Sequence, residues 1–177
     1  MNIAEKIVEI PENVNIEIMD KEVKVMGPKG SQCIDFSHLP IRISLKDDKV
    51  SFSVLWPKKK EYSMLGSSAS QLKNMIKGVT EGFTYKLKSV HAHFPVTIKV
   101  QEKEKKISIE NFIGEKKPRI SKIVGDIEVK VVGDEIIIHG MNIQEVSQTA
   151  ANIEEATKIK YKDQRVFLDG IYISEKK

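Results

Sequence analysis

Basic side chains gather in the last part of the chain, where they could bind phosphate groups. Within eight residues there is one acid, Asp163, against four basic residues, Lys158, Lys160, Lys162 and Arg165. Arginine binds phosphate through a planar fork of donors, whereas lysine binds it as a point charge. A run of this kind is also typical of a solvated surface. The run alone therefore leaves both interpretations open.

A second basic segment lies earlier in the chain, over residues 114–122. It has one acid, Glu115, and four basic residues, Lys116, Lys117, Arg119 and Lys122. Pro118 disfavours regular structure there, so we expect a protruding loop. Phe112, just before the loop, could be a core residue at a strand end or a face on which a base stacks. A basic loop beside an aromatic ring suits the irregular surface of folded RNA.

Groups that could do catalysis are few. His91 and His93 form a pair that could face one side of a strand and bind a metal, but no third ligand lies near them in the sequence. The acidic pairs at residues 47–48 and 134–135 fall in expected hairpin turns, where carboxylates usually accept from backbone amides or face water. Neither a nucleophile motif nor a glycine-rich phosphate-binding signature is present. We expect no enzyme, no metal and no cofactor.

Composition narrows the class of protein. The 177 residues include 29 basic and 25 acidic side chains, a formal net charge of +4. The single cysteine, Cys33, cannot form an intrachain disulfide, which favours a reducing compartment. No apolar run approaches the roughly 20 residues that a membrane span needs, and the first ten residues do not form a signal peptide. We expect a cytoplasmic protein with no membrane partner.

The expected elements occur twice in the same order. Alternation of apolar and polar residues predicts strands at 14–18, 23–25, 41–45, 50–54 and 85–90, and again at 96–100, 105–109, 127–131, 136–139 and 165–173. Apolar residues at helical spacing predict a helix over 65–79, with Ser68 and Gln71 capping it near its start, and a second helix over 143–157 capped by Asn142. The basic run at 58–60 is expected to be a solvated loop.

This order predicts an α+β fold made of two tandem copies of a small antiparallel sheet packed against one helix, the product of an internal duplication. We expect an N-terminal α+β domain over residues 1–84 and a C-terminal α+β domain over residues 85–177. Alternating strands need cover on one face only, and one helix per domain can supply it.

Several strings together resemble one protein family. They are residues 27–30, 74–83, 93–95, 111–116 and 165–172. The string Asn74-Met75-Ile76-Lys77-Gly78-Val79-Thr80-Glu81-Gly82-Phe83 is the most specific of them. In this order they resemble the universal large-subunit ribosomal protein "L six" family, in its archaeal and eukaryotic branch, over essentially the whole chain.

The resemblance implies a structural constituent of the large ribosomal subunit without enzymatic activity. Its C-terminal domain would be the main RNA-binding lobe, on 23S-type rRNA near the sarcin–ricin loop and the docking site of translational GTPases. Other expected partners are neighbouring ribosomal proteins, with the chain a monomer within the ribosome. By motif the RNA-facing residues would be Phe112, Gly114, Lys116, Lys117, Arg119, Lys162, Arg165, Asp169 and Gly170. Charge and proximity alone add Lys122, Lys158 and Lys160.

Two rival functions stay open from the residues themselves. A protein-interaction module would use exposed sheet edges, and its binding would scarcely depend on salt. A small enzyme would use His91 and His93 and would contain a bound metal.

Overall fold

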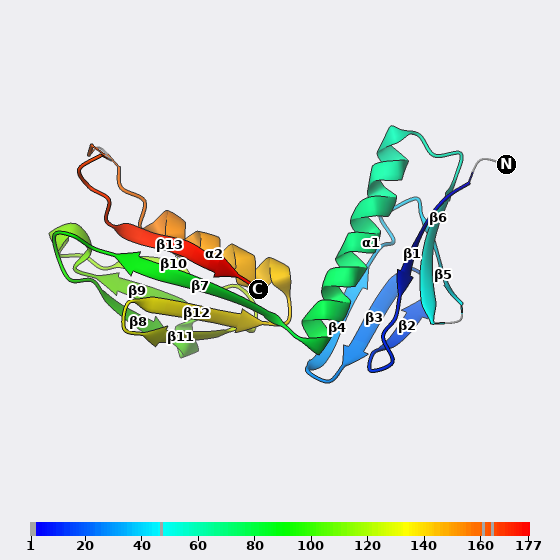
Figure 1. Ribbon diagram of the computed structural model, residues 1–177, viewed down its shortest axis with the longest axis horizontal. Helices are drawn as coiled ribbons and strands as arrows, with labels where there is room; N and C mark the ends of the chain where they lie inside the picture. Colours follow the sequence, from blue (N-terminus) through cyan, green and yellow to red (C-terminus); the bar gives the residue numbers. More distant parts are fainter. Residues whose placement is uncertain (1–2, 47, 161, 164) are drawn as a thin grey trace. The chain divides into compact units, whose positions relative to one another are not determined.

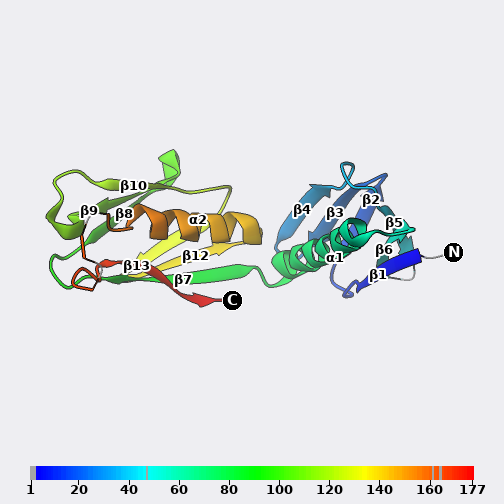
Figure 2. The same ribbon diagram turned by 90° about the horizontal axis from the view of Figure 1, so that it is seen from above.

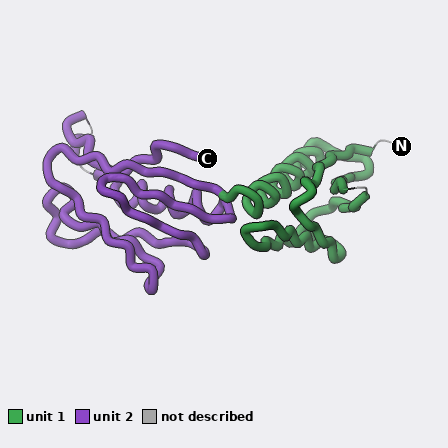
Figure 3. The backbone as a smooth tube through the Cα atoms, turned by 60° about the horizontal axis from the view of Figure 1, so that its bottom comes forward, with its two compact units in different colours: residues 1–82 green, residues 83–177 purple. Residues whose placement is uncertain are grey.

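The computed structural model describes residues 3–46, 48–160, 162–163 and 165–177 (Figure 1). The chain divides into two compact units, residues 1–82 and residues 83–177 (Figure 3). The expected boundary after residue 84 differs by two residues, because Phe83 already belongs to the second unit. Its ring is buried there, and its backbone pairs with Gly140.

Unit 1 consists of two three-stranded antiparallel sheets and one helix. The sheets have the strand orders β1-β6-β5 and β2-β3-β4, and the helix packs against strands of both. The elements are β1 (Ile3–Glu9), β2 (Asn15–Met19), β3 (Glu22–Gly27), β4 (Gly30–Asp35), β5 (Arg42–Lys46), β6 (Lys49–Leu55) and α1 (Lys59–Thr80). Alternate residues of β6, among them Val50 and Phe52, face α1 residues such as Leu65 and Leu72 in one hydrophobic core.

Unit 2 repeats this arrangement and adds a strand. Its sheets have the orders β10-β9-β8 and β11-β12-β7-β13, and α2 packs on strands of both (Figure 2). The elements are β7 (Phe83–Val90), β8 (Thr97–Gln101), β9 (Lys106–Glu110), β10 (Arg119–Lys122), β11 (Glu128–Val132), β12 (Glu135–Gly140), α2 (Ile143–Ala156) and β13 (Gly170–Lys176), with short 3₁₀ turns η1 (Glu102–Glu104) and η2 (Phe112–Gly114).

The two units correspond element by element. The meander β2-β3-β4 matches β8-β9-β10, and the sheet β1-β6-β5 matches β7-β12-β11. Helix α1 follows β6 in the chain, and α2 follows the matching strand β12. Strand β13 has no counterpart in unit 1 and pairs with the free edge of β7. The expected α+β duplication is confirmed, and the connection between α2 and β13 is the part in which unit 2 departs from the repeat.

Each unit divides its strands between two small antiparallel sheets where one was expected, and three of these strands were not predicted. Edge strand β1 carries Glu5 and Lys6 in its middle, which hides its alternation. Strand β4 reads Gly-Ser-Gln-Cys-Ile-Asp and has few apolar residues. Strand β10 begins directly after Pro118, inside the segment expected to be a loop. Each unit therefore has two small sheets.

Helix α1 begins nine residues before the expected cap at Ser68. The Glu61 carboxylate accepts a hydrogen bond from the Lys58 backbone N–H at 2.9 Å, so the basic run at 58–60 is the start of the helix and not a loop. Ser68 is buried in the middle of the helix. At the other end of the chain, β13 begins at Gly170 and not at Arg165, and Asn142 caps α2 as predicted, by accepting from Gln144 N–H at 3.0 Å.

Candidate nucleic-acid interface

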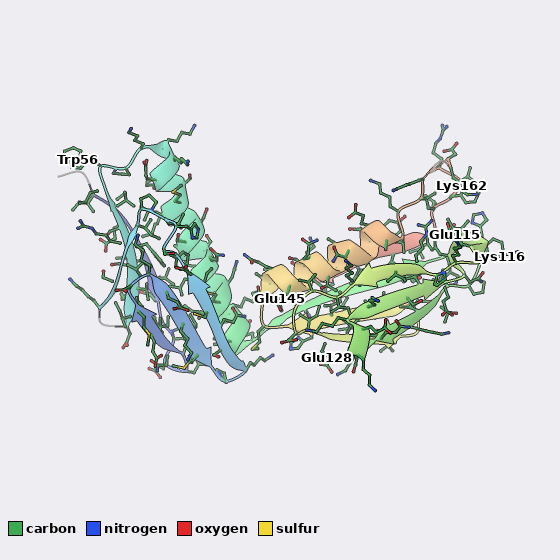
Figure 4. All side chains as sticks on the ribbon, turned by 180° about the vertical axis from the view of Figure 1, so that it is seen from behind. Trp56, Glu115, Lys116, Glu128, Glu145 and Lys162 are labelled. Carbon is green, nitrogen blue, oxygen red and sulfur yellow. The ribbon has the colours of Figure 1, made fainter. Side chains whose placement is uncertain are left out.

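The two basic segments predicted from the sequence meet at one end of unit 2. Figure 4 shows Glu115, Lys116 and Lys162 together at that end, while Glu145, in the first turn of α2, lies at the opposite end of the unit. We call this cluster the basic tip and define it as Lys116, Lys117, Lys158, Lys160, Lys162 and Arg165. The connection from α2 to β13 and the segment before β10 supply these residues.

Arg119 ties the two segments to each other. Its guanidinium binds both carboxylate oxygens of Glu115, with N···O distances of 2.9 and 2.6 Å. The same group donates to the backbone carbonyls of Ala156 and Lys158, at 3.0 and 3.1 Å, where α2 ends. Ala156 is the last residue of α2, and the final carbonyls of a helix have no N–H of that helix to accept from, so the cation caps this end. Four of the five N–H donors of Arg119 are thus engaged within the protein, so the residue holds the two segments together, and its contact with phosphate stays a prediction.

Phe112 packs beneath this guanidinium. The Arg119 Cζ atom lies 4.5 Å from the centroid of the ring, a cation–π geometry. The residue is only 1 % exposed and belongs to the core of unit 2. Of the two interpretations that the sequence left open, the structure favours the core residue: the Phe112 ring is covered and supports the site from beneath.

The electrostatics of Glu115 agree with this arrangement. The hydrogen bond from Arg119 is the main reason that the pKa of the Glu115 carboxyl lies below its ordinary value; burial opposes it, and the charges of Arg119 and Lys162 add to the lowering. The carboxylate is thus held as an anion, and its ion pair is with Arg119.

Asp169 is a buried anchor of the connection to β13. The residue is 2 % exposed. One carboxylate oxygen accepts from the backbone N–H groups of Ala92 and His93 at 2.8 and 3.3 Å, and the other bonds His93 Nδ1 at 2.8 Å. Burial acts to raise the pKa of this carboxyl, but these hydrogen bonds together hold it below its ordinary value. Asp169 therefore positions the chain and is not itself accessible to RNA.

A stack of side chains extends from this anchor to the surface. The His93 ring lies against Phe167, with centroids 5.0 Å apart and planes 25° from parallel. Lys162 Nζ lies 4.5 Å from the centroid of the Phe167 ring. Sequence reasoning missed His93 and Phe167 as positioning residues, although both lie in strings that carried the family resemblance.

The metal hypothesis for His91 and His93 finds no support in this geometry. His93 uses its Nδ1 on Asp169. In the part of the chain that the structure describes, no three His, Cys, Asp or Glu side chains are grouped as metal ligands.

Two glycines permit the close backbone approaches of the site. Gly114 has φ +72°, and a Cβ there would lie 3.3 Å from the Phe94 ring. At Gly170 a Cβ would lie 2.9 Å from the Tyr172 hydroxyl, which bonds Leu168 O. Both residues act through the backbone conformation, because neither has a side chain to offer a ligand.

The lysines of the basic tip remain available for a ligand. All of them are exposed, and within the described residues no ion pair involves Lys116, Lys117, Lys158 or Lys160. Arg165 binds Asp163 at 3.2 Å, but its side chain is 90 % exposed. Over residues 112–119 and 157–170 there are seven basic and three acidic residues, a net charge of +4. Such a surface attracts a polyanion.

Lys122 lies outside the basic tip. It ends β10, four residues long, and is therefore about 10 Å along the strand from Arg119. Its backbone carbonyl accepts from Asn152 Nδ2 in α2. The side chain is exposed, but the structure does not bring it together with the other candidates.

Neither α-helix in the described part of the chain combines the length and the apolar composition that crossing a membrane requires.

Comparison with known proteins identifies the class to which this duplicated fold belongs, a class of ribosomal proteins. The profile of the family described as Ribosomal protein L6 matches residues 10–82 and again residues 94–170, one match in each unit. The chain therefore belongs to the Ribosomal protein L6 family, whose members are structural proteins and not enzymes.

Relatives cover nearly the full length of the chain. The large ribosomal subunit protein uL6 of Desulfurococcus amylolyticus is 49% identical over 176 residues, 99% of this chain and 95% of that protein. Those of Staphylothermus marinus and Archaeoglobus fulgidus are 49% and 46% identical, over 94% and 97% of this chain and 91% and 89% of theirs.

Proposed function

We propose that this chain is a structural protein of the large ribosomal subunit and that it binds 23S-type rRNA through the basic tip of unit 2. Membership of a ribosomal protein family supports the proposal, as do relatives that are named large ribosomal subunit proteins. One observation carries the RNA contact: four exposed lysines at one end of unit 2 make no ion pair within the described residues.

Binding proceeds by neutralisation of phosphates on a preformed scaffold. Each lysine that contacts a phosphate releases condensed counterions from the RNA, which makes the affinity depend on salt. Arg119, Asp169 and the stack of His93 on Phe167 fix the segments that carry the lysines. A rigid arrangement avoids the entropy cost of ordering a flexible loop on binding.

The family resemblance directs the proposal to one region of the rRNA, near the sarcin–ricin loop and beside the docking site of translational GTPases. Neighbouring ribosomal proteins would be further contacts, with one copy of the chain per subunit. Hydroxyl-radical footprinting of large-subunit rRNA with and without the protein tests this position. Protection confined to other parts of the rRNA would contradict it.

The contact itself is tested with the double variant Lys116→Ala/Lys117→Ala. Binding to in vitro transcribed large-subunit rRNA is measured across a range of salt concentrations. Two lost phosphate contacts should weaken the affinity and flatten its log–log salt dependence by about 1.4 to 1.8. The matched control is Lys99→Ala/Lys130→Ala, which removes the same charge from lysines that pair with Glu110 and Glu128 elsewhere on unit 2. An equal loss in both variants would mean that general charge, and not the basic tip, drives binding.

A further inference from the structure

Trp56 is the only tryptophan in the chain, and it is not part of the core. It lies in the connection between β6 and α1, and it is 69 % exposed (Figure 4). Its φ is +53°, in the left-handed region that a bulky residue rarely adopts. Conformations of this kind persist only where the surrounding structure fixes them, and they cluster at functional sites. The fold thus holds a large aromatic ring in solvent.

The indole lines a surface hollow of about 290 Å³ with groups of complementary chemistry. Arg42 and Ser53, which are cross-strand partners on β5 and β6, line the same hollow, as does Glu61 in the first turn of α1. The residues that line the hollow therefore carry a flat ring, a guanidinium fork, a hydroxyl and a carboxylate. These are the groups that recognise an unstacked nucleotide: a face on which the base stacks, a hydrogen-bond donor to its phosphate, and acceptors for the amino groups of the base.

The surroundings of the hollow carry an excess of positive charge. Lys58, Lys59 and Lys60 follow Trp56 and are exposed. Among the described residues neither they nor Arg42 make an ion pair. The acids nearby are Glu61, which accepts from Lys58 N–H, and Glu5, the cross-strand partner of Ser53.

A second exposed ring, Tyr62, is 55 % exposed and lies three residues after Lys59 on the same face of α1. Cations interleaved with exposed aromatic rings are typical of surfaces that bind single-stranded nucleic acid.

We propose that this patch, made of Trp56, Arg42, Glu61, Tyr62 and Lys58–Lys60, is a second RNA-binding site and takes an unpaired nucleotide. The base stacks on the indole, and Arg42 with the lysines binds the flanking phosphates. The inference rests on the proposed function in that its ligand is the same rRNA, but the surface belongs to unit 1. The excess of unpaired cations favours a polyanion over a protein surface as the occupant.

The single tryptophan makes the site directly observable. The full chain is titrated with in vitro transcribed large-subunit rRNA, while the anisotropy of a labelled RNA reports binding and acrylamide quenching reports access to Trp56. We expect at least a threefold fall in the quenching constant on saturation. Trp56→Ala should weaken binding about 5- to 160-fold, which corresponds to the 1–3 kcal/mol lost with one stacked base. Met19→Ala, which truncates a 70 % exposed side chain of β2, should bind as the unaltered chain does.

A second variant tests the same site in case the Trp56→Ala protein does not fold. Arg42→Gln leaves the indole in place and removes one cation that would contact a phosphate. It should therefore weaken binding and flatten the log–log slope of affinity against salt by about 0.7 to 0.9. Circular dichroism of each variant checks that unit 1 is folded.

The outcomes separate this inference from the proposed function. If acrylamide still quenches Trp56 in the bound chain and Trp56→Ala binds RNA normally, the second site is refuted. If Lys116→Ala/Lys117→Ala loses affinity in the same experiments, the proposal that the basic tip binds RNA still stands. The reverse pattern refutes the basic tip and supports the second site. Protection of Trp56 only after purified large-subunit proteins are added would refute the RNA site in favour of a protein partner, and absence of rRNA binding by the unaltered chain would refute both proposals.

Discussion

Arg119 joins the segment before β10 to the end of α2. Its carboxylate partner, Glu115, lies four residues before it in the sequence. The carbonyls of Ala156 and Lys158 lie 37 and 39 residues away and become neighbours only when α2 packs beside β10. Sequence patterns report local spacing, so a contact made by tertiary packing was not predictable. The burial of Phe112 under the Arg119 guanidinium is also a tertiary contact, so the sequence allows both a core residue and a stacking face.

Arg119→Ala should destabilise unit 2 by about 2 kcal/mol, because it leaves helix-terminal carbonyls and Glu115 without their donor. Urea unfolding followed by circular dichroism measures the change. The control is Arg165→Ala, whose side chain is 90 % exposed and should change stability by less than about 0.5 kcal/mol. Equal effects of the two substitutions would mean that the Arg119 contacts contribute nothing beyond surface charge.

Asp169 makes the stability of unit 2 depend on pH in the acidic range. A carboxyl whose folded pKa lies below its unfolded value contributes stability above the unfolded value, and the contribution is lost as pH falls through the folded one. The stability difference between the unaltered chain and Asp169→Asn should therefore be constant near neutral pH and shrink below about pH 4. Urea midpoints of both proteins between pH 7 and pH 3 test this. A difference that grows with acid would reverse the assigned sign.

At the scale of elements, the periodic segments were predictable and the irregular ones were not. Strands β2, β6 and β11 alternate clearly, and α2 was found with its cap at Asn142. Strands β1, β4 and β10 escaped because charged or polar residues occupy positions that alternation would make apolar. The turn η2 has φ +52° at Ile113, a conformation that neither composition nor periodicity indicates.

The turn before β10 should control RNA affinity through its shape alone. Gly114→Ala places a side chain at φ +72° and should cost about 1–2 kcal/mol of stability. It should also weaken rRNA binding, because it displaces Lys116 and Lys117 without changing any charge. Gly133→Ala is matched to it, with φ +60° and no atom within 4 Å of the added Cβ, in the turn between β11 and β12. The proposed geometry is contradicted if both variants bind rRNA alike.

At the scale of the molecule, the chain is one fold used twice with one addition. The duplication was predictable because both halves repeat the same order of patterns, and the family match covers each unit. Strand β13 and its connection have no counterpart in unit 1, and four of the six residues of the basic tip lie in that connection. Most of the basic tip thus lies in the part of unit 2 that has no counterpart in unit 1, and the periodicity of the sequence does not indicate this.

The boundary between the units has a measurable consequence. A fragment of residues 83–177 should fold by itself, because unit 2 has its own core. A fragment of residues 85–177 loses the buried ring of Phe83 and the hydrogen bonds between Thr84 and Lys177, so it should be less stable by about 2 kcal/mol or more. Urea unfolding of both fragments, with the full chain as reference, measures this. Equal stabilities would place the boundary after residue 84.

The pairing of β13 with β7 also sets an order of events during synthesis. Unit 1 closes its sheets from residues 3–55 and can begin to fold while the ribosome is still translating the second half. Unit 2 cannot complete its four-stranded sheet at that stage, because β13, which pairs with β7, is translated some eighty residues later. The connection that carries four of the six residues of the basic tip therefore takes its final position only after β13 has been translated, at the very end of synthesis.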